Sequence, residues 1–382
     1  MTAQGPKFVM VRSVADTGRM KFTRLREALG DRLLVVPARH SDLKRWVAAD
    51  RARKGLVPGP PEPHHFAEAE GNVLRKVAQY PMLGRLDWLR QAYHASKARH
   101  AQLAEARLRE IWKTWPDAIA LVHNGFNLPD SALADVAGPG RRIFLENGYF
   151  RGTVQADPQG INADNTLPRD PDFYRAYQPD ERPLDLVPSV RVSKHGKDEV
   201  DALPGTYVFV PFQVESDSQI TRQSPWIADM MAFHAELARL ADRLPALTFV
   251  VKEHPNTRRL VKPRVTPHPR VLFRNGADTA ALIAGASRVM TINSTVGIEA
   301  LAVGKPVLVL GEACYGIEGL VQRAGSSDAT AAALGKPPPD PDVDLRQRFL
   351  HYLYYHFLLR DDGVPDGRDA EEVLREVLAR SA

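Results

Sequence analysis

The chain has 382 residues, of which 44% are hydrophobic and 25% are charged, and its formal net charge is +5 at pH 7. A chain of this length usually forms more than one hydrophobic core, so we expect two domains. The single cysteine, Cys314, excludes an intramolecular disulfide and favours a reducing compartment. The positive charge suits an anionic substrate or an anionic membrane surface. We expect no nucleic-acid partner, because no basic run is interleaved with aromatic residues.

The apolar segments of the chain are short. The first of them, Phe8–Val11, is far shorter than the hydrophobic region of a signal peptide. No segment approaches the roughly 18 apolar residues of a membrane-spanning helix. We therefore expect a cytoplasmic protein, with peripheral association with the inner face of the membrane as an open alternative.

Short apolar runs alternate with helical stretches along the first half of the chain, as they do in α/β domains. Helices are expected between Phe66 and Trp112, and the proline-rich stretch Lys54–His65 is expected to be an exposed loop. The candidate strands of this half are Lys7–Arg12, Arg32–Pro37, Ala118–His123 and Arg142–Glu146.

The second half repeats this alternation after a polar, proline-containing linker, Pro179–Gly205. We therefore predict an α/β fold with two Rossmann-like domains, over residues 1–180 and 205–345. C-terminal helices over 346–382 follow, and packing back onto the first domain is one option for them. The candidate strands are Tyr207–Gln213, Leu247–Lys252, Val271–Arg274, Arg288–Ile292 and Pro306–Leu310, and the candidate helices are Ile227–Leu244, Asp278–Ala284, Val296–Val303, Leu345–Leu359 and Ala370–Ala379.

Two segments of the second half carry groups that can bind phosphate at the end of a strand. In the first, Lys252 and His254 follow a buried strand, and both side chains can donate to phosphate oxygens. Taken alone, a solvated lysine and a loop-anchoring histidine are the simpler explanation.

The second segment runs from a strand into a helix. Asn293 or Ser294 can cap that helix, and its first turn, together with Thr295, can present N–H groups to an anion. Glu299 in the same helix can accept ribose hydroxyls, or it can simply compensate the helix dipole. Two such elements on strands of one sheet are more specific than either alone.

Two carboxylates of the first half suggest glycosyl transfer. Glu146 ends a strand before a glycine turn, and Asp157 follows eleven residues later, directly before a proline. One carboxylate can attack or shield the reacting sugar carbon while the other exchanges a proton. The plainer alternatives are an ordinary Asp-Pro turn and a surface ion pair.

The segments FLENGYFRG, ADPQGIN, LPRDPDFY, VPFQVESDSQI, KEHP, NSTVGIEAL and LGEACYGIEGL occur in this order between Val122 and Leu320. Together they resemble the core of the bacterial capsule β-Kdo transferases of the KpsS/KpsC group. The resemblance implies a GT-B fold, in which two Rossmann-like domains face a central cleft. It also implies a CMP-Kdo donor without a further cofactor, a saccharide or glycolipid acceptor, and association with the inner membrane or with other capsule assembly proteins.

By position, the resemblance makes Asp157 the nucleophile of a retaining reaction, through a covalent Kdo adduct, and Glu146 the general acid/base. In one departure, Asn147 follows Glu146 where many members of the group have a second carboxylate, so Glu146 is the sole proton carrier expected there. The positions that hold the CMP phosphate in the group correspond to Lys252, His254, Ser294 and Thr295.

Five further polar residues are candidates for the expected cleft. A guanidinium fork fits a carboxylate well, so Arg151 and Arg169 are expected to pair with the carboxylate of Kdo. Asn124, Gln213 and Gln219 follow predicted strands and are expected to line the cleft. Each of the five can instead serve only to order its own loop.

No metal ion is expected, because Asp170-Pro171-Asp172 lies in a turn-rich stretch and no other Asp-x-Asp motif ends a strand. Two alternatives to the Kdo transferase stay open. One is another CMP- or UDP-sugar transferase of the GT-B type, including an inverting one. The other is a non-catalytic GT-B-like protein that scaffolds capsule assembly, which CMP release from CMP-Kdo would exclude.

Overall fold

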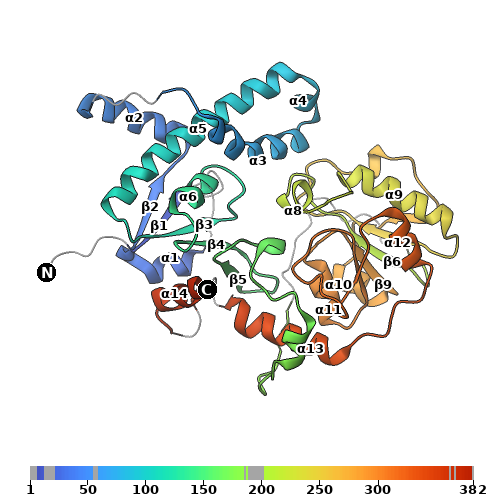
Figure 1. Ribbon diagram of the computed structural model, residues 1–382. Coiled ribbons are helices and arrows are strands. Elements are labelled where there is room, and N and C mark those ends of the chain that lie inside the picture. The colour runs from blue at the N-terminus through green and yellow to red at the C-terminus, as the bar shows by residue number, and fades with distance from the viewer. Residues whose placement is uncertain are drawn as a thin grey trace. The chain divides into compact units, whose positions relative to one another are not determined.

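The computed structural model describes residues 7–12, 22–54, 59–184, 186–187, 202–360, 363–364 and 367–380. The chain forms two compact units, and each contains a six-stranded sheet with helices around it (Figure 1). The first unit comprises Met1–Gly148, Gly152–Thr166 and Phe357–Ala382, and the second comprises Tyr149–Arg151 and Leu167–His356. The prediction of an α/β fold with two Rossmann-like sheets is confirmed, while the central cleft stays a prediction.

The sheet of the first unit has the strand order β12-β5-β4-β3-β1-β2. The strands β2, β1, β3 and β4 are parallel, whereas β5 is antiparallel to β4 and β12 is antiparallel to β5. The carboxyl ends of four neighbouring strands therefore meet at one edge of this sheet. The strands are β1 (Phe8–Arg12), β2 (Leu33–Pro37), β3 (Ile119–His123), β4 (Arg142–Asn147), β5 (Thr153–Asp157) and β12 (Leu359–Arg360).

Helix α3 of the first unit begins at Pro63, which can occupy the first helical position without losing a hydrogen bond, and Glu62 and His65 form a capping box around it. Helix α3 then packs along α5. The helices of the unit are α1 (Thr23–Leu29), α2 (His40–Lys54), α3 (Pro63–Gln79), α4 (Pro81–Arg85), α5 (Asp87–Thr114), α6 (Asp130–Ala137) and α14 (Ala370–Ala379).

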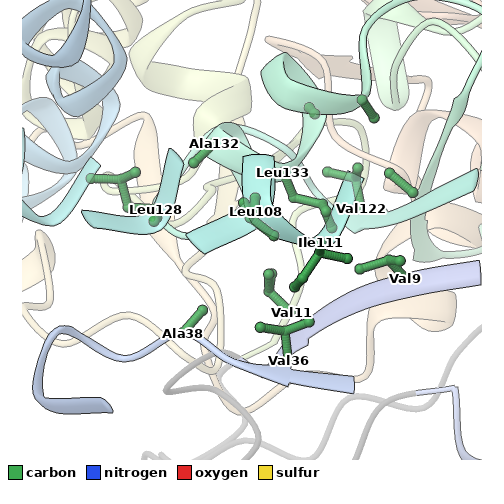
Figure 2. Close-up of a cluster of buried hydrophobic side chains, with 14 of the residues drawn as sticks. Val9, Val11, Val36, Ala38, Leu108, Ile111, Val122, Leu128, Ala132 and Leu133 are labelled. Carbon is green, nitrogen blue, oxygen red and sulfur yellow. The ribbon is translucent and has the colours of Figure 1, made fainter. Parts of the chain in front are cut away.

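Both faces of this sheet are buried. In β1, Val9 and Val11 point into one hydrophobic cluster, while Phe8 and Met10 point into a second cluster on the other face. The first cluster includes Leu108 and Ile111 of α5 and Leu133 of α6, together with side chains of β1, β2 and β3 (Figure 2). The second contains side chains of α1 and α14. The four successive apolar residues of β1, from Phe8 to Val11, thus follow from a strand covered on both faces.

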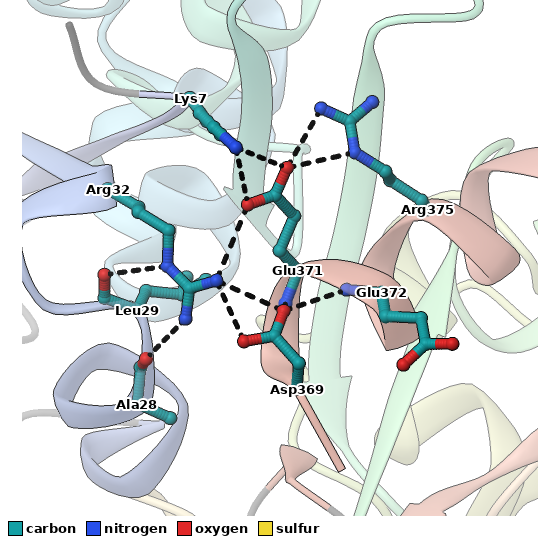
Figure 3. Close-up of polar contacts among 8 residues, drawn as sticks. All are labelled: Lys7, Ala28, Leu29, Arg32, Asp369, Glu371, Glu372 and Arg375. Carbon is teal, nitrogen blue, oxygen red and sulfur yellow. Dashed lines mark hydrogen bonds and ion pairs between the residues drawn. The ribbon is translucent and has the colours of Figure 1, made fainter. Parts of the chain in front are cut away.

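The C-terminal helix α14 belongs to the first unit, although it is distant in sequence. It packs on β4 and β5, and its acidic first turn lies beside two basic residues of the N-terminal region (Figure 3). Lys7 Nζ lies 3.0 Å from a carboxylate oxygen of Glu371, and an Arg32 guanidinium nitrogen lies 2.8 Å from Asp369. Acidic side chains at a helix N-terminus also compensate the helix dipole.

The second unit has the strand order β11-β10-β9-β6-β7-β8, and all its recorded pairs are parallel. Its strands are β6 (Val208–Pro211), β7 (Phe249–Lys252), β8 (Val271–Phe273), β9 (Arg288–Thr291), β10 (Val307–Val309) and β11 (Gln322–Arg323). Its helices are α7 (Pro171–Ala176), α8 (Ser218–Thr221), α9 (Met230–Arg243), α10 (Thr279–Gly285), α11 (Val296–Ala302), α12 (Ser327–Leu334) and α13 (Val343–Tyr352), and a π-helical turn covers Leu353–Phe357.

The starts of these helices are set by local sequence. In six of them a side-chain oxygen of the N-cap residue accepts a backbone N–H of the first turn, which satisfies a donor that the helix itself leaves free. The six N-cap residues are Asp170, Asp217, Asp229, Asp278, Ser326 and Asp342.

The structure differs from the sequence-based expectations in several places. Helices α2 and α3 take only the two ends of the expected loop Lys54–His65, at Lys54 and Pro63–His65, while 59–62 form no helix and 55–58 lie outside the described residues. Strand β5 was not predicted, and Asp170–Asp172 starts a helix instead of a turn. The second unit begins at Leu167, and α13 belongs to it, whereas Phe357–Ala382 belongs to the first unit. Most of the expected linker lies outside the described residues.

Candidate active site

A group of polar side chains lies where β3 and β4 end in the first unit. The Asn124 side-chain amide donates to Glu146 Oε2 over 3.0 Å, and His123 Nε2 lies 3.9 Å from the same oxygen. The other oxygen, Oε1, accepts the N–H of Asn147 over 2.9 Å. The Glu146 and His123 side chains are 18% and 21% exposed, so both can be reached from solvent. The arrangement provides a positioned carboxylate with an imidazole beside it.

The turn after β3 explains how Asn124 reaches Glu146. Asn124 has a φ of 65° and Gly125 a φ of 83°, a left-handed conformation that asparagine tolerates and glycine adopts freely. A Cβ at position 125 would also lie 2.5 Å from the ring of Phe144. The Asn124 N–H donates to the carbonyl of Leu145 in β4, so the turn is fixed against the neighbouring strand.

His123 is the residue of this group that sequence reasoning missed. It is the last residue of β3, and it pairs in register with Leu145, the neighbour of Glu146. A histidine at the end of a strand was visible in the sequence. Its nearness to Glu146 depends on the pairing of β3 with β4, which the sequence pattern does not specify.

Asp157 is the last residue of β5, a strand that was not predicted, and it has no exposed surface. One carboxylate oxygen accepts the N–H groups of Gln159 and Gly160, over 2.8 and 3.1 Å. The other accepts the N–H and the hydroxyl of Thr166, over 2.8 and 2.5 Å. In the β4–β5 register Glu146 faces Gln155, and Asp157 follows two residues later on the same face of the sheet. Asp157 therefore organises the loop that follows it.

In the second unit, Gln213 and Asn293 form one buried network at the ends of β6 and β9. The Gln213 amide donates to Asn293 Oδ1 over 2.8 Å. The Asn293 amide donates to the carbonyls of Gln219 and Gln223 over 2.8 and 3.1 Å. Gln213 and Gln219 therefore meet Asn293, and the three residues fix the segment that carries Ser294 and Thr295.

The cap of α11 differs from the sequence-based prediction. The N-cap residue is Thr295, and its side chain makes no capping hydrogen bond. Ser294 Oγ accepts the N–H of Val296 over 3.2 Å, and the Ser294 carbonyl accepts the hydroxyl of Tyr315 over 2.5 Å. A Cβ on Gly297 would lie 2.3 Å from that hydroxyl, so the Tyr315 ring requires glycine at this position. Glu299 is buried one turn into the helix.

Lys252 and His254 lie at and just after the end of β7, which is separated from β9 by β6. The Lys252 ammonium donates to the carbonyl of Ala277, and burial lowers the pKa of Lys252 while the nearby Asp278 opposes this effect. His254 Nδ1 accepts the N–H of Asn256 over 3.1 Å. Glu253 between them is buried and accepts from Asn275 over 2.8 Å. The two basic groups thus share the carboxyl edge of this sheet with Gln213 and Asn293.

The two candidate arginines lie in different surroundings. Arg151 is exposed, and its backbone N–H donates to Val187. The Arg169 guanidinium donates to the carbonyl of Leu167. Burial raises the pKa of the Cys314 thiol, and the positive charge of Arg169 opposes that rise. Arg169 therefore lies near Cys314.

Within the described part of the chain, the residues spaced to hold a metal ion are His64, His65 and Glu105. His65 Nδ1 accepts the N–H of Glu62 over 2.8 Å, so its proton is on Nε2, which lies 2.7 Å from Glu105. The lone pair that a metal would need at Nε2 is therefore occupied by that proton. Burial opposes ionisation of Glu105, but hydrogen bonds from His64, Arg109 and His65 outweigh it and lower the pKa of Glu105 to about 2. The group acts as a hydrogen-bonded link between α3 and α5.

Comparison with known proteins identifies the family. The chain is 43% identical over 293 residues to Protein FixF of Sinorhizobium fredii (strain NBRC 101917 / NGR234), which covers 76% of this chain and 73% of FixF. The chain belongs to the FixF family. Residues 188–362 of this FixF-family chain also match the family described as "Capsule polysaccharide biosynthesis protein".

Two other similarities of the FixF-family chain concern capsule proteins. The chain is 26% identical over 277 residues to the capsule polysaccharide export protein KpsS of Escherichia coli, over 56% of this chain and 70% of KpsS. Among solved structures it is similar to KpsC of Thermosulfurimonas dismutans, a β-Kdo 2,7 transferase, with 20% identity and a TM-score of 0.46 over 72% of this chain and 89% of that one. The predicted resemblance to the capsule group is thus confirmed at the level of sequence similarity to KpsS and of the matched family.

The helices in the described part of the chain include none with both the length and the apolar character that a bilayer crossing requires.

Proposed function

We propose that this chain is a glycosyltransferase of capsule polysaccharide assembly that transfers β-Kdo from CMP-Kdo to a saccharide or glycolipid acceptor. The observation that carries the proposal is the partly exposed carboxylate of Glu146, held by Asn124 beside His123 at the carboxyl edge of a Rossmann-like sheet. The match of residues 188–362 to the capsule biosynthesis family supports the pathway. The motif resemblance described above supports the Kdo donor.

In this proposal Glu146 exchanges the proton of the acceptor or leaving group. Its Oε2 accepts from Asn124 and lies near His123, so the carboxylate is held in one orientation before substrate arrives. Asn124 acts on the reaction through Glu146 and is a positioning residue. Lys252, His254, Ser294 and Thr295 bind the donor phosphate, for which the two basic side chains supply positive charge without a metal ion or another cofactor.

A retaining reaction through a covalent Kdo adduct assigns the nucleophile to Asp157. Its four hydrogen bonds and its complete burial mean that the loop after β5 must open before Asp157 can reach a sugar carbon. The same burial favours a second candidate, an inverting transferase in which Glu146 acts as the general base. Mapping of the adduct, described in the Discussion, separates the two.

Incubation of the purified protein with CMP-Kdo is expected to release CMP, and the rate is expected to be unchanged by EDTA. Chromatography of CMP measures the rate, and parallel thermal-shift scans compare CMP, UDP and GDP, since a ligand that binds the native state raises its melting temperature. Stabilisation by UDP alone, together with turnover of a UDP-sugar, would show that the donor is a UDP-sugar and not CMP-Kdo. Loss of turnover in EDTA that magnesium restores would contradict the metal-free reaction. If none of the nucleotide-sugar donors is turned over, the non-catalytic scaffold alternative is left.

We also propose that the first unit binds an anionic membrane surface through residues 74–90, the helical tip. Six of the eleven large hydrophobic side chains that are exposed in the described residues lie in this short segment. The tip also carries four basic residues and one acidic residue, so its positive charge complements anionic headgroups. Figure 1 shows α4 at the end of the helical pair α3 and α5, away from the sheet of this unit. The six side chains are Leu74, Tyr80, Met82, Leu86, Trp88 and Leu89.

Vesicle sedimentation tests the tip. The protein is expected to bind vesicles of phosphatidylcholine with phosphatidylglycerol more tightly than phosphatidylcholine alone, and salt is expected to weaken binding. The double variant Met82→Ser, Trp88→Ser should bind at least about tenfold more weakly, because two large apolar side chains no longer enter the interface. Val303→Ser, a change at an exposed valine of the second unit, is the matched control. Equal vesicle binding by the parent and the double variant would exclude the helical tip as the membrane-binding segment. Binding to a capsule assembly protein without vesicle binding would make a protein, and not the membrane, the partner of the tip.

A further inference from the structure

A pocket of about 470 Å³ lies at the carboxyl ends of β1 and β2 in the first unit, and its lining is rich in arginine. Arg12 ends β1, and Arg39 follows β2 by two residues. Arg45 comes from α2 and Arg107 from α5. Asp42 is the sole carboxylate among the lining residues, so four guanidinium groups surround one negative charge.

The partners of these arginines leave most of the positive charge uncompensated. Arg45 lies 2.5 Å from Asp42, which offsets one charge. The Arg107 guanidinium lies over the ring of Trp46, 5.3 Å from its centroid, an interaction that keeps the charge in place without neutralising it. Arg39 Nε is buried and has no hydrogen-bond partner within the described residues. In the same part of the chain, Arg12, Arg39 and Arg107 have no recorded ion pair with a carboxylate.

Like charges gathered in one pocket repel each other unless an anion joins them. A guanidinium presents parallel N–H donors that match two oxygens of a phosphate or carboxylate, and a buried donor without a partner gains most from such a ligand. The Trp46 ring adds an apolar wall beside these donors. The pocket is therefore suited to an oxyanion attached to an organic group of moderate size.

The position of the pocket links it to the carboxylate site. The strands β2, β1, β3 and β4 are parallel neighbours, so the pocket and Glu146 lie along the same edge of one sheet. From β1 to β4 there are two strand spacings, which correspond to about 10 Å. A ligand with its anionic group in the pocket could therefore extend along the edge and bring a hydroxyl to Glu146.

We infer that this pocket binds an anionic group, a phosphate ester or a carboxylate, of the acceptor. That the bound molecule is the acceptor rests on the proposed function. The binding of the oxyanion itself can be measured without any donor. It assigns the acceptor to the anionic saccharides or glycolipids and gives its charged group a place in the first unit.

Fluorescence titration tests the pocket, with Trp46 as the reporter. Four probes are added separately to the full-length protein: inorganic phosphate, glycerol 3-phosphate, glucuronate and the neutral sugar glucose. Saturable fluorescence changes are expected with at least one anion and not with glucose, and the Trp46→Phe variant should lose the signal. Response to the phosphates or to glucuronate tells which oxyanion the pocket prefers.

Matched variants complete the test. Arg39→Gln and Arg107→Gln should each weaken binding of the responding anion by roughly 10–100-fold, because each removes a charged donor. Arg109→Gln, at an exposed residue of the same helix as Arg107, should bind like the parent. No saturable response with any anion, or equal weakening in all three variants, would overturn the inference. Anion binding in a protein that does not release CMP from CMP-Kdo would retain the pocket and reject the transferase.

Discussion

Glu146→Gln is expected to lower kcat by roughly 10²–10⁴-fold, the range that a general acid or base usually contributes. The glutamine side chain has the same shape, so the loss reflects the missing proton exchange and not a cavity. Transfer of the sugar to an acceptor, followed by chromatography of the product and of CMP, measures kcat. Thermal unfolding of the variant confirms that it is folded.

Two further variants serve as comparisons for Glu146→Gln. Glu110→Gln changes the same residue type at a carboxylate of α5 that pairs with Lys113 and has no part in the proposed site, so it should keep the kcat of the parent. Asn124→Ala removes the hydrogen bond that orients Glu146, and it should lower kcat less than Glu146→Gln and shift the pH profile of kcat. Near-normal turnover by Glu146→Gln would exclude Glu146 as the proton carrier.

Asp157→Asn is expected to lower the free energy of unfolding by about 2–4 kcal/mol. The carboxylate of Asp157 accepts four hydrogen bonds with both of its oxygens. An asparagine would place an amide donor against two of these donors, in a site without exposed surface. Urea denaturation measures the change. As a comparison, Thr166→Val removes a single hydroxyl donor to Asp157 and should lower the free energy of unfolding by only about 1 kcal/mol. Equal stabilities of the parent and Asp157→Asn would contradict the buried network.

The mechanistic role of Asp157 requires a separate measurement, because loss of stability alone also lowers activity. Incubation with CMP-Kdo in the absence of acceptor, followed by mass spectrometry of the intact protein, tests the double displacement. That mechanism predicts one added Kdo, mapped to the peptide that contains Asp157. An adduct on Glu146 would move the nucleophile to that residue. An α-configured product without any adduct on the parent protein would favour the inverting alternative.

Strands and helix starts were largely readable from the sequence, because their causes are local. The strand Ile119–His123, for example, lies within the predicted Ala118–His123, since a strand buried on both faces needs an uninterrupted apolar run. Helix α14 has the predicted bounds Ala370–Ala379, because Asp369 caps it and its apolar residues recur at helical spacing.

Strand β5 shows where local patterns were insufficient. Its five residues, Thr153–Asp157, include polar side chains and precede an Asp-Pro pair, which is typical of a turn. They form a strand because β4 and β12 supply hydrogen-bond partners on both sides, and β12 comes from the far end of the chain. The burial of Asp157, on which the choice between retaining and inverting chemistry depends, follows from this pairing.

The sequence by itself determined which residue types could serve as proton carrier, phosphate ligand and helix cap, and it marked Glu146 at the end of its strand. Only the tertiary structure decided which of them meet. His123 lies beside Glu146 because β3 pairs with β4, and Arg12 and Arg107 share a pocket because β1 and α5 pack in one unit. Side chains nearly a hundred residues apart are brought together by the burial of apolar faces on either side of the sheet, and that arrangement is a property of the whole core rather than of any segment.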